Sequence, residues 1–173
     1  MSEPAYECVV VGAGAAGLFA AARAARRGMR TLLLEKNPRP GVKILMSGGT
    51  RCNLTHNCDS RAIVAAFGPG GRFLHSALAA LSPADLVAWF NVAGVPTKVE
   101  ETGKVFPVSN RAADVLAALT SELRASGAEL ALEEPLREFE AEGDGFALRT
   151  ERRTLRARRV IVTTGGCSDA GSG

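Results

Sequence analysis

The sequence predicts an α/β fold of the Rossmann type, with a parallel sheet, helices on both of its faces and an antiparallel β-meander inserted before the last strand. Three observations predict it. A turn with the spacing G-x-G-x-x-G joins an apolar strand at residues 8–11 to a helix. A second apolar strand, residues 31–34, ends in Glu35. A third, residues 160–162, runs into a Thr-Thr-Gly-Gly turn at its carboxyl end, the end at which open α/β sheets bind ligands.

The glycines of the first turn are Gly12, Gly14 and Gly17. In such turns the first glycine permits a sharp reversal, the second leaves room for a pyrophosphate beside the backbone, and the third lets the helix pack closely on the strand. Glu35 lies where a carboxylate accepts a hydrogen bond from a ribose 2′-hydroxyl in this type of fold. An ordinary glycine turn with Glu35 as a solvated strand end is disfavoured, because strand, helix and carboxylate occur together.

The helix after the turn is expected over residues 15–27, where alanines keep it thin and Gly28 ends it. The strand that follows, residues 30–35, is apolar and preceded by a helix. We therefore expect it to be parallel to the first strand and covered on both faces.

Residues 36–59 form a long segment with little apolar periodicity. Loops of this length in compact domains are usually functional or disordered. The segment contains an apolar stretch at residues 42–46, and its glycine pair, Gly48 and Gly49, stands beside Arg51. Small residues next to hydrogen-bond donors suit backbone that lies against a flat ligand. The alternative is a loop that only caps the sheet.

Residues 60–132 are predicted to contain three successive helices, two strands, a long helix and a further strand. Ser82, Pro83 and Asp85 begin one helix, with Ser82 as its N-cap and Asp85 at the positive end of its dipole. A long amphipathic helix ends at Gly127. The other expected elements are helices over residues 61–67 and 72–81, and strands over residues 95–100, 104–108 and 129–132.

Residues 134–158 are expected to form the inserted meander, with Asp144-Gly145 as a hairpin turn. This region is rich in arginine, which raises the possibility of a nucleic-acid surface. Glutamates stand among the arginines and no aromatic residues interleave with them, so a solvated hairpin face is favoured.

The last predicted strand places Thr164 and Gly165 beside the first glycine turn, across one crevice, because parallel strands end at the same edge of a sheet. This arrangement requires that the strands carrying Val11 and Val162 be neighbours.

The composition is that of an ordinary globular protein. The chain has 173 residues, 46% of them hydrophobic and 23% charged, with a formal net charge of +3 that is too small to imply nucleic-acid binding. No run approaches the ~18 uninterrupted apolar residues of a membrane span, and no basic region followed by an apolar stretch begins the chain. We therefore expect no membrane association and a cytoplasmic location.

Cys8 lies in an apolar strand and is expected in the core, and the cysteines are expected as free thiols. Cys52, His56 and Cys58 would supply three metal ligands, one short of a closed structural zinc site, so a metal site is disfavoured. A redox disulfide between Cys52 and Cys58 is an alternative that ranks above zinc and below free thiols.

Four sequence blocks together resemble one family. VGAGAAG with LLLEK is similar to the FAD-binding opening of the glutathione-reductase-like flavoproteins. VKILMSGGTRCNLTHN is more specific and resembles the signature of the BaiN-type flavoproteins, which are NAD(P)/FAD-dependent oxidoreductases. GKVFPVSNRAADV and VIVTTGGCSDAGSG resemble two further blocks of that family in the same order. The resemblance covers essentially the whole chain.

The sequence departs from the family pattern at several positions. Thr50 stands where the family usually has a third glycine, Lys104 where arginine is commoner, and Ser168-Asp169 where an aromatic-proline pair is usual. The family also continues with an inserted domain and a last strand and helix that contact the flavin. The resemblance therefore implies that residues 1–173 are a truncated FAD-binding domain without its C-terminal remainder.

The resemblance implies roles in FAD binding for residues spread along the chain. The glycine turn would hold the pyrophosphate, Glu35 and Lys36 would bind the adenosine ribose, and residues 36–59 would run along the flavin. Leu136 would meet the adenine edge, a role that rests on the resemblance alone. The complete set is Gly12, Gly14, Ala15, Ala16, Gly17, Glu35, Lys36, Lys43, Gly48, Gly49, Thr50, Arg51, Leu136, Thr164 and Gly165.

These inferences predict a flavoprotein oxidoreductase that passes hydride from a nicotinamide donor, NAD(P)H, through FAD to a small organic acceptor. The sequence shows no nucleophile or triad, so no catalytic residue is assigned. Two alternatives remain: an inactive FAD- or nucleotide-binding fragment, and a nucleic-acid-modifying flavoprotein that uses the arginine-rich hairpin. A simple NAD-binding domain would explain the glycine turn and Glu35, but the SGGTRCN and TTGG blocks favour FAD.

Overall fold

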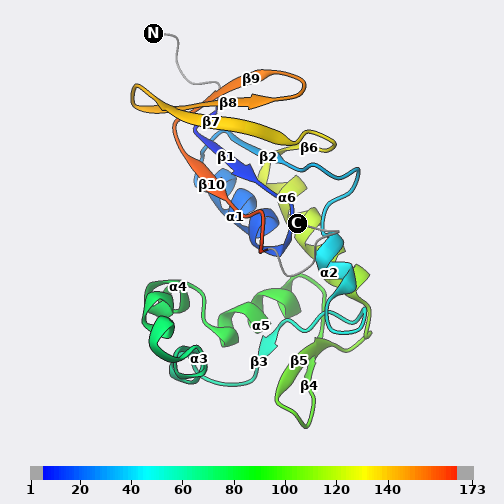
Figure 1. Ribbon diagram of the computed structural model, residues 1–173. Coiled ribbons are helices and arrows are strands. Elements are labelled where there is room, and N and C mark those ends of the chain that lie inside the picture. Colours follow the sequence, from blue (N-terminus) through cyan, green and yellow to red (C-terminus); the bar gives the residue numbers. More distant parts are fainter. Residues whose placement is uncertain (1–5, 167–173) are drawn as a thin grey trace. The chain divides into compact units, whose positions relative to one another are not determined.

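The computed structural model describes residues 6–166 (Figure 1). The chain divides into two compact units. The first, called here the sheet unit, joins Met1–Lys43 to Leu119–Gly173, and the second, called the helical unit, is Ile44–Ala118. The predicted departure at Ser168-Asp169 lies outside the described residues.

A four-stranded parallel sheet in the order β10-β1-β2-β6 forms the centre of the sheet unit. Val11 pairs with Leu34 on one side and with Val162 on the other, so the predicted neighbourhood of the first and last strands is confirmed. The predicted α/β fold class is confirmed as well. The strands are β1 (Cys8–Val11), β2 (Thr31–Leu34), β6 (Glu129–Ala131) and β10 (Val160–Val162).

Helix α1 (Ala15–Arg26) packs closely against β1 and β2, as its alanines predict. Its buried side consists of small residues with Leu18, so little side-chain volume separates it from the sheet. Gly28, with φ 81°, ends the helix in the left-handed conformation that favours glycine. The last turns of α6 (Ala112–Ser126) lie beside α1, where Arg26 Nε donates to Glu122 Oε1 at 3.0 Å.

Within residues 6–166 the other face of the sheet is covered by the meander and not by a helix, which corrects the expectation of helices on both faces (Figure 1). Leu148 and Leu155 of the meander pack with Val9 and Leu32 of the sheet in one buried cluster. Alternate residues of antiparallel strands point to the same side, so three short strands present enough apolar surface to take the place of a helix. The strands are β7 (Leu136–Glu142), β8 (Gly145–Thr150) and β9 (Thr154–Ala157).

The helical unit contains a small antiparallel sheet, β3-β5-β4, and several short helices. Ser82 and Asp85 form the predicted N-terminal cap of α5, with each side chain accepting a backbone N–H of the other residue. The elements are α3 (Ser60–Ala66), the 3₁₀ helix η1 (Gly68–Leu74), α4 (His75–Ala80), α5 (Pro83–Val92), β3 (Thr55–His56), β4 (Thr97–Val99) and β5 (Lys104–Pro107).

Residues 36–59, expected as a loop, contain a short helix, α2 (Val42–Met46), and the two-residue strand β3. Strand β3 forms because Thr55 pairs with Val105 of β5, a tertiary contact that local sequence does not encode. The glycine-rich residues 68–71, which lie between the expected helices 61–67 and 72–81, begin a 3₁₀ helix.

Residues 68–92 are long and apolar enough to cross a membrane by length and composition alone, which is weak evidence for a span. The backbone is extended at Leu81, with φ −151° and ψ 93°, and a new helix is capped at Ser82. The segment is therefore divided into helices of seven, six and ten residues. Each is shorter than the roughly 20 residues that a spanning helix needs.

Candidate nucleotide-binding site

A cavity of about 350 Å³ opens at the carboxyl ends of β1, β2 and β10 within the sheet unit. This volume lies in the range of small-molecule sites. The cavity brings together residues from the glycine turn, the end of β2, the start of α2, the start of the meander and the turn after β10. The predicted site residues that line it are Gly12, Gly14, Ala15, Ala16, Glu35, Lys36, Lys43, Leu136, Thr164 and Gly165.

The three glycines of the first turn differ in what surrounds them. A Cβ at Gly12 would lie 2.8 Å from the carbonyl oxygen of Thr163, and one at Gly17 would lie 1.8 Å from the carbonyl oxygen of Gly12. A Cβ at Gly14 would meet nothing within 4 Å. The fold therefore requires glycine at the first and third positions, while the second has open space around it and lines the cavity.

Thr163 ties the turn after β10 to the glycine turn. Its backbone N–H donates to the carbonyl oxygen of Val11 at 2.9 Å, and its hydroxyl lies 2.8 Å from that oxygen and 2.9 Å from the carbonyl oxygen of Gly12. Thr164 and Gly165 follow directly at the cavity wall. Two turns about 150 residues apart in the chain are thus bonded to each other.

The N-terminus of α1 faces the cavity with Ala15 and Ala16. Gly14 occupies the N-cap position and offers no capping side chain, and the first turn holds no acidic residue. The first N–H groups of a helix lack intrahelical acceptors and carry the positive end of its dipole. Together with the open space above Gly14, this arrangement suits an anionic group such as a diphosphate.

Glu35 has a second role that sequence reasoning missed. The residue is buried, with 7% exposure. Its Oε2 accepts the backbone N–H of Ala13 at 2.7 Å, while Oε1 accepts the backbone and side-chain N–H groups of Asn37 at 2.9 and 2.7 Å. The carboxylate therefore anchors the glycine turn to the end of β2. A carboxylate offers about four acceptor positions, so roughly one remains for a ligand hydroxyl.

Lys43 stands near the start of α2 and reaches the turn after β10. Its Nζ donates to the carbonyl oxygen of Gly166 at 3.2 Å. A Cβ built at Gly165 would lie 3.4 Å from the same nitrogen. This lysine brings a positive charge to the cavity, where an anionic ligand would gain from it.

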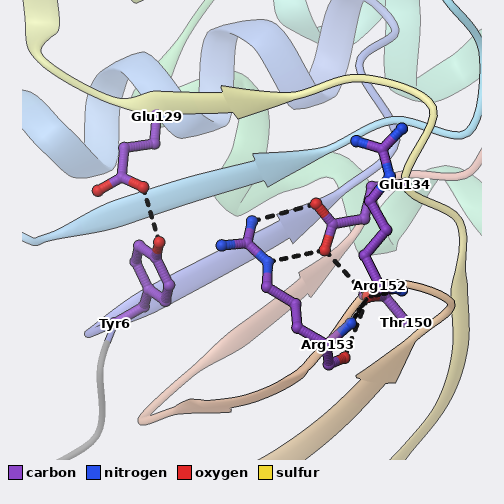
Figure 2. A network of polar contacts seen from close by, with 6 residues as sticks. All are labelled: Tyr6, Glu129, Glu134, Thr150, Arg152 and Arg153. Atoms are coloured by element: carbon purple, nitrogen blue, oxygen red, sulfur yellow. Dashed lines mark hydrogen bonds and ion pairs between the residues drawn. The ribbon is translucent and has the colours of Figure 1, made fainter.

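An ion pair at the start of the meander, between a buried carboxylate and an exposed guanidinium, was not predicted (Figure 2). Glu134 lines the cavity, and its side chain is 3% exposed. Arg153 grips both carboxylate oxygens, with Nε to Oε1 at 2.8 Å and Nη2 to Oε2 at 3.1 Å, while the Thr150 hydroxyl lies 2.9 Å from Oε1. At another point of the sheet unit, the Tyr6 hydroxyl donates to Glu129 at 2.7 Å (Figure 2).

Glu134 should make the stability of the chain depend on acid pH. Burial raises the pKa of Glu134, but hydrogen bonds from Arg153 and Thr150 and the arginine charges outweigh it, so the net pKa is lowered. A carboxylate with a lowered folded-state pKa stabilises the fold above its unfolded pKa and loses that contribution as pH falls through the folded-state pKa.

We expect the unfolding free energy of the wild type to exceed that of Glu134→Gln by a constant amount above roughly pH 5 and by less as pH falls below it. Urea unfolding of both proteins across this range measures the difference. A difference that grows as pH falls would contradict the assignment.

Gly48, Gly49, Thr50 and Arg51 belong to the helical unit and are not among the residues that line the cavity. Arg51 is engaged inside its own unit: Nη1 donates to Glu100 at 2.6 Å, and the guanidinium lies 4.1 Å from the centre of the Phe106 ring. Gly17 also does not line the cavity, because it packs beneath the turn.

The loop that contains these residues holds an unusual backbone. Gly48, Gly49, Thr50 and Cys52 all have φ between 56° and 68°, in the left-handed region. That conformation costs roughly 1–2 kcal/mol for a residue with a Cβ. Thr50 is the position at which related sequences are expected to have glycine.

Thr50→Gly should therefore raise the unfolding free energy by about 0.5–1 kcal/mol, the relief of strain less the extra backbone entropy of glycine. Thr50→Ala is the matched control, because it keeps a Cβ and should bring no such gain. Urea unfolding of the three proteins measures the effect. A destabilised glycine variant would show that the hydroxyl or methyl group of Thr50 contributes more than the strain costs.

Cys8 is 1% exposed in β1, which confirms its place in the core. Cys8, Cys52 and Cys58 are free thiols. Burial raises the pKa of Cys8, and it also raises that of Cys52 despite a hydrogen bond with Ser47. Such thiols are poor nucleophiles at neutral pH. Within residues 6–166 no cluster of side chains suited to a metal ion is found.

Comparison with known proteins identifies relatives over nearly the whole chain. The family model described as the HI0933-like protein Rossmann domain matches residues 6–173. The ribosomal RNA dihydrouridine synthase of Escherichia coli (strain K12) is 30% identical over 97% of this chain, and that of Haemophilus influenzae (strain ATCC 51907 / DSM 11121 / KW20 / Rd) is 32% identical over 96%. The chain spans 41% and 42% of the lengths of these two curated relatives.

A solved structure shares the fold at low sequence identity. The 3-ketosteroid-delta4-(5alpha)-dehydrogenase of Rhodococcus jostii RHA1 superposes with a TM-score of 0.67 at 16% identity, over 93% of this chain and 46% of that chain. This similarity supports the Rossmann-like architecture alone. The family match, by contrast, covers the glycine turn, the SGGTRCN loop and the turn after β10 together. The chain therefore belongs to the HI0933-like Rossmann-domain family, the FAD-binding flavoproteins that its four sequence blocks resemble.

Proposed function

We propose that this chain is the FAD-binding N-terminal portion of an oxidoreductase that transfers hydride from NAD(P)H to a small organic acceptor. One observation carries the proposal: the glycine turn, the buried carboxylate of Glu35 and the turn at Thr164-Gly165 line one cavity at the carboxyl ends of neighbouring parallel strands. This is the position at which open α/β folds bind dinucleotides.

The residues present fit FAD. The open space above Gly14 and the N-terminus of α1 would receive the diphosphate, with Lys43 contributing charge. The remaining acceptor position of Glu35 would receive a ribose hydroxyl, with Lys36 alongside. Leu136 lies on the cavity wall, where it would meet the adenine.

The remaining predicted ligands are Gly48, Gly49, Thr50 and Arg51 of the helical unit. We propose for these residues the flavin-side role that the family resemblance implies; the backbone is left-handed at Gly48, Gly49 and Thr50. When bound, FAD would accept two electrons from a nicotinamide donor and deliver them as hydride to an acceptor. The chain's residues would bind and orient it. The cytoplasm, which holds NAD(P)H, is the proposed location.

Anaerobic titration of the FAD-loaded chain with NADH and with NADPH tests the proposal. Bleaching of the oxidised-flavin absorbance, restored when an electron acceptor is added, is the expected result. An inactive FAD-binding fragment would retain bound flavin that neither nucleotide reduces. A chain that binds NAD but no FAD would instead be a simple NAD-binding domain.

Glu35→Ala should weaken FAD binding by about 1–3 kcal/mol, because ribose hydroxyls would be left poorly paired. The same change releases the N–H groups of Ala13 and Asn37, so stability must be separated from recognition. Comparison of ADP with 2′-deoxy-ADP makes the separation: the wild type should prefer ADP, and the variant should lose that preference. If the wild type and the variant prefer ADP over 2′-deoxy-ADP to the same degree, Glu35 does not recognise the ribose hydroxyl.

RNA is a second candidate acceptor, favoured by the names of the two curated relatives, both ribosomal RNA dihydrouridine synthases. The arginine-rich hairpin gives this candidate limited support. Arg137, Arg149 and Arg156 pair with glutamates of the same meander, so much of its positive charge is neutralised.

A direct assay distinguishes the two acceptors. If RNA is the acceptor, the reduced, FAD-loaded chain should be reoxidised under anaerobic conditions by unmodified ribosomal RNA, with loss of uridine absorbance. Arg152→Glu with Arg158→Glu should weaken binding to that RNA, and the weakening should diminish at high salt. Arg153 is unsuitable for this test because it is bonded to Glu134. If RNA does not reoxidise the reduced flavin, RNA is not the acceptor and the small-molecule acceptor remains the proposed one.

A further inference from the structure

The ion pair between Glu134 and Arg153 differs from the other ion pairs in residues 6–166. Its carboxylate is 3% exposed, whereas the other acidic partners expose at least 29% of their side chains. The Arg153 side chain is 41% exposed, so the desolvation cost falls mainly on the Glu134 carboxylate, where it offsets part of the attraction. The stability of the fold therefore does not by itself account for a charged pair here.

The pair joins two parts of the sheet unit that local sequence does not connect. Arg153 comes from the turn between β8 and β9, where its N–H and that of Arg152 donate to the Thr150 hydroxyl at 3.0 and 3.1 Å. Glu134 comes from the segment that leads into β7. The side-chain bonds thus fix the entry of the meander to the β8–β9 turn at the same end of the meander, where Leu136 pairs with Thr150 (Figure 2).

The same segment is also bonded through its backbone to the end of β2. The N–H of Glu134 donates to the carbonyl oxygen of Glu35 at 2.9 Å, and the N–H of Glu133 donates to that of Asn37 at 3.1 Å. Glu133 is in the left-handed region, with φ 53°. Residues 134–136, called here the pocket wall, all line the cavity. Glu134 of this wall is bonded through its backbone to Glu35 and through its side chain to Arg153.

We propose that Glu134 and Arg153 are positioning residues for the nucleoside half of the bound nucleotide. Their ion pair sets the distance between the pocket wall and Glu35, and so the width of the part of the cavity that receives ribose and base. The inference rests on the proposed nucleotide site but does not require that the nucleotide be FAD. Neither side chain is assigned a contact with the reacting atoms.

The test compares one single and one double variant in the full chain, with ADP and FAD as separate probes. Arg153→Met leaves a buried carboxylate without its partner, so both melting temperature and nucleotide affinity should fall. Arg153→Met combined with Glu134→Gln removes the unpaired charge and should recover most of the melting temperature. If the pair positions the wall, ADP affinity stays roughly tenfold below wild type in the double variant, the loss expected when one hydrogen-bonded contact is misplaced.

Two further variants keep the test decisive. Arg149→Met is the matched control: it breaks an arginine–glutamate pair of the same meander whose side chains are more than half exposed, and it should change neither quantity. Arg153→Lys keeps the charge and loses the two-pronged geometry, so it should weaken ADP severalfold while the protein remains folded.

Recovery of ADP affinity together with melting temperature in the double variant would overturn the inference and show a purely stabilising pair. Wild-type affinity in Arg153→Lys would overturn it as well, even if the methionine variants fail to fold. Failure of the proposed function is a different result: a wild type that binds ADP and not FAD refutes the flavoprotein while the comparison of variants proceeds with ADP.

Discussion

Replacing Gly14 with valine should abolish FAD binding and leave the fold intact. The valine side chain would occupy the open space that the structure leaves above the turn, where we place the diphosphate. The backbone at Gly14, with φ −76° and ψ −171°, is accessible to valine. We expect affinity to fall at least about 100-fold, or roughly 2.7 kcal/mol. Equilibrium dialysis with FAD measures it.

Valine is a poor N-cap, so this variant should also lose on the order of 1 kcal/mol of stability. Ser82→Ala is the matched control, because it removes the side chain that caps α5 and should cost about as much. Ser82 does not line the cavity, so FAD affinity should be unchanged in the control. Retention of yellow flavin by Gly14→Val would refute the phosphate assignment.

Gly17→Ala should have the largest effect on folding. The added Cβ would stand 1.8 Å from the carbonyl oxygen of Gly12 and 2.7 Å from the Thr163 hydroxyl oxygen, so α1 would have to move away from the sheet. Overpacking of this kind costs up to about 3 kcal/mol and occasionally more. We expect a melting temperature lower by many degrees, or no soluble protein.

Gly14→Ala provides the comparison for this variant, since it adds the same methyl group three residues earlier, where nothing lies within 4 Å. Thermal unfolding followed by circular dichroism should separate the two variants clearly. Similar melting temperatures would mean that α1 does not pack as closely on the turn as the structure shows.

The parallel sheet could be predicted from sequence because its signals are local. Residues 8–11 and 31–34 are apolar runs beside a glycine turn and a helix, and each forms a fully buried strand. The capping pair Ser82 and Asp85 acts within one helical turn and was likewise predictable. Features of this kind can be predicted without knowing which distant segments they contact.

The parts that escaped prediction depend on contacts between distant segments. Strand β3 exists through its pairing with β5, and no pattern in two residues announces it. The meander took the place of an expected helix layer because Leu148 and Leu155 face the sheet, which strand alternation alone does not reveal. Alternation shows that one side is apolar and leaves open what that side covers.

The candidate site divides in the same way. The glycine turn and Thr164-Gly165 were predicted to share one edge because parallel strands end together, and one cavity contains both. Leu136 came from family resemblance alone, and it lines that cavity too. The bond between Glu134 and Arg153 could not be predicted. Every arginine and glutamate of a charged hairpin is expected to face solvent unless its partner is known.

The central claim is that the glycine turn and the turn after β10, which are distant in sequence, bind one diphosphate together. Nuclear magnetic resonance of the ¹⁵N-labelled chain during titration with FAD tests it most directly. The amide signals of Gly14, Ala15, Thr164 and Gly165 should shift together along one binding curve, with those of the β8–β9 turn changing far less. Shifts confined to one of the two turns, or located away from both, would contradict the claim.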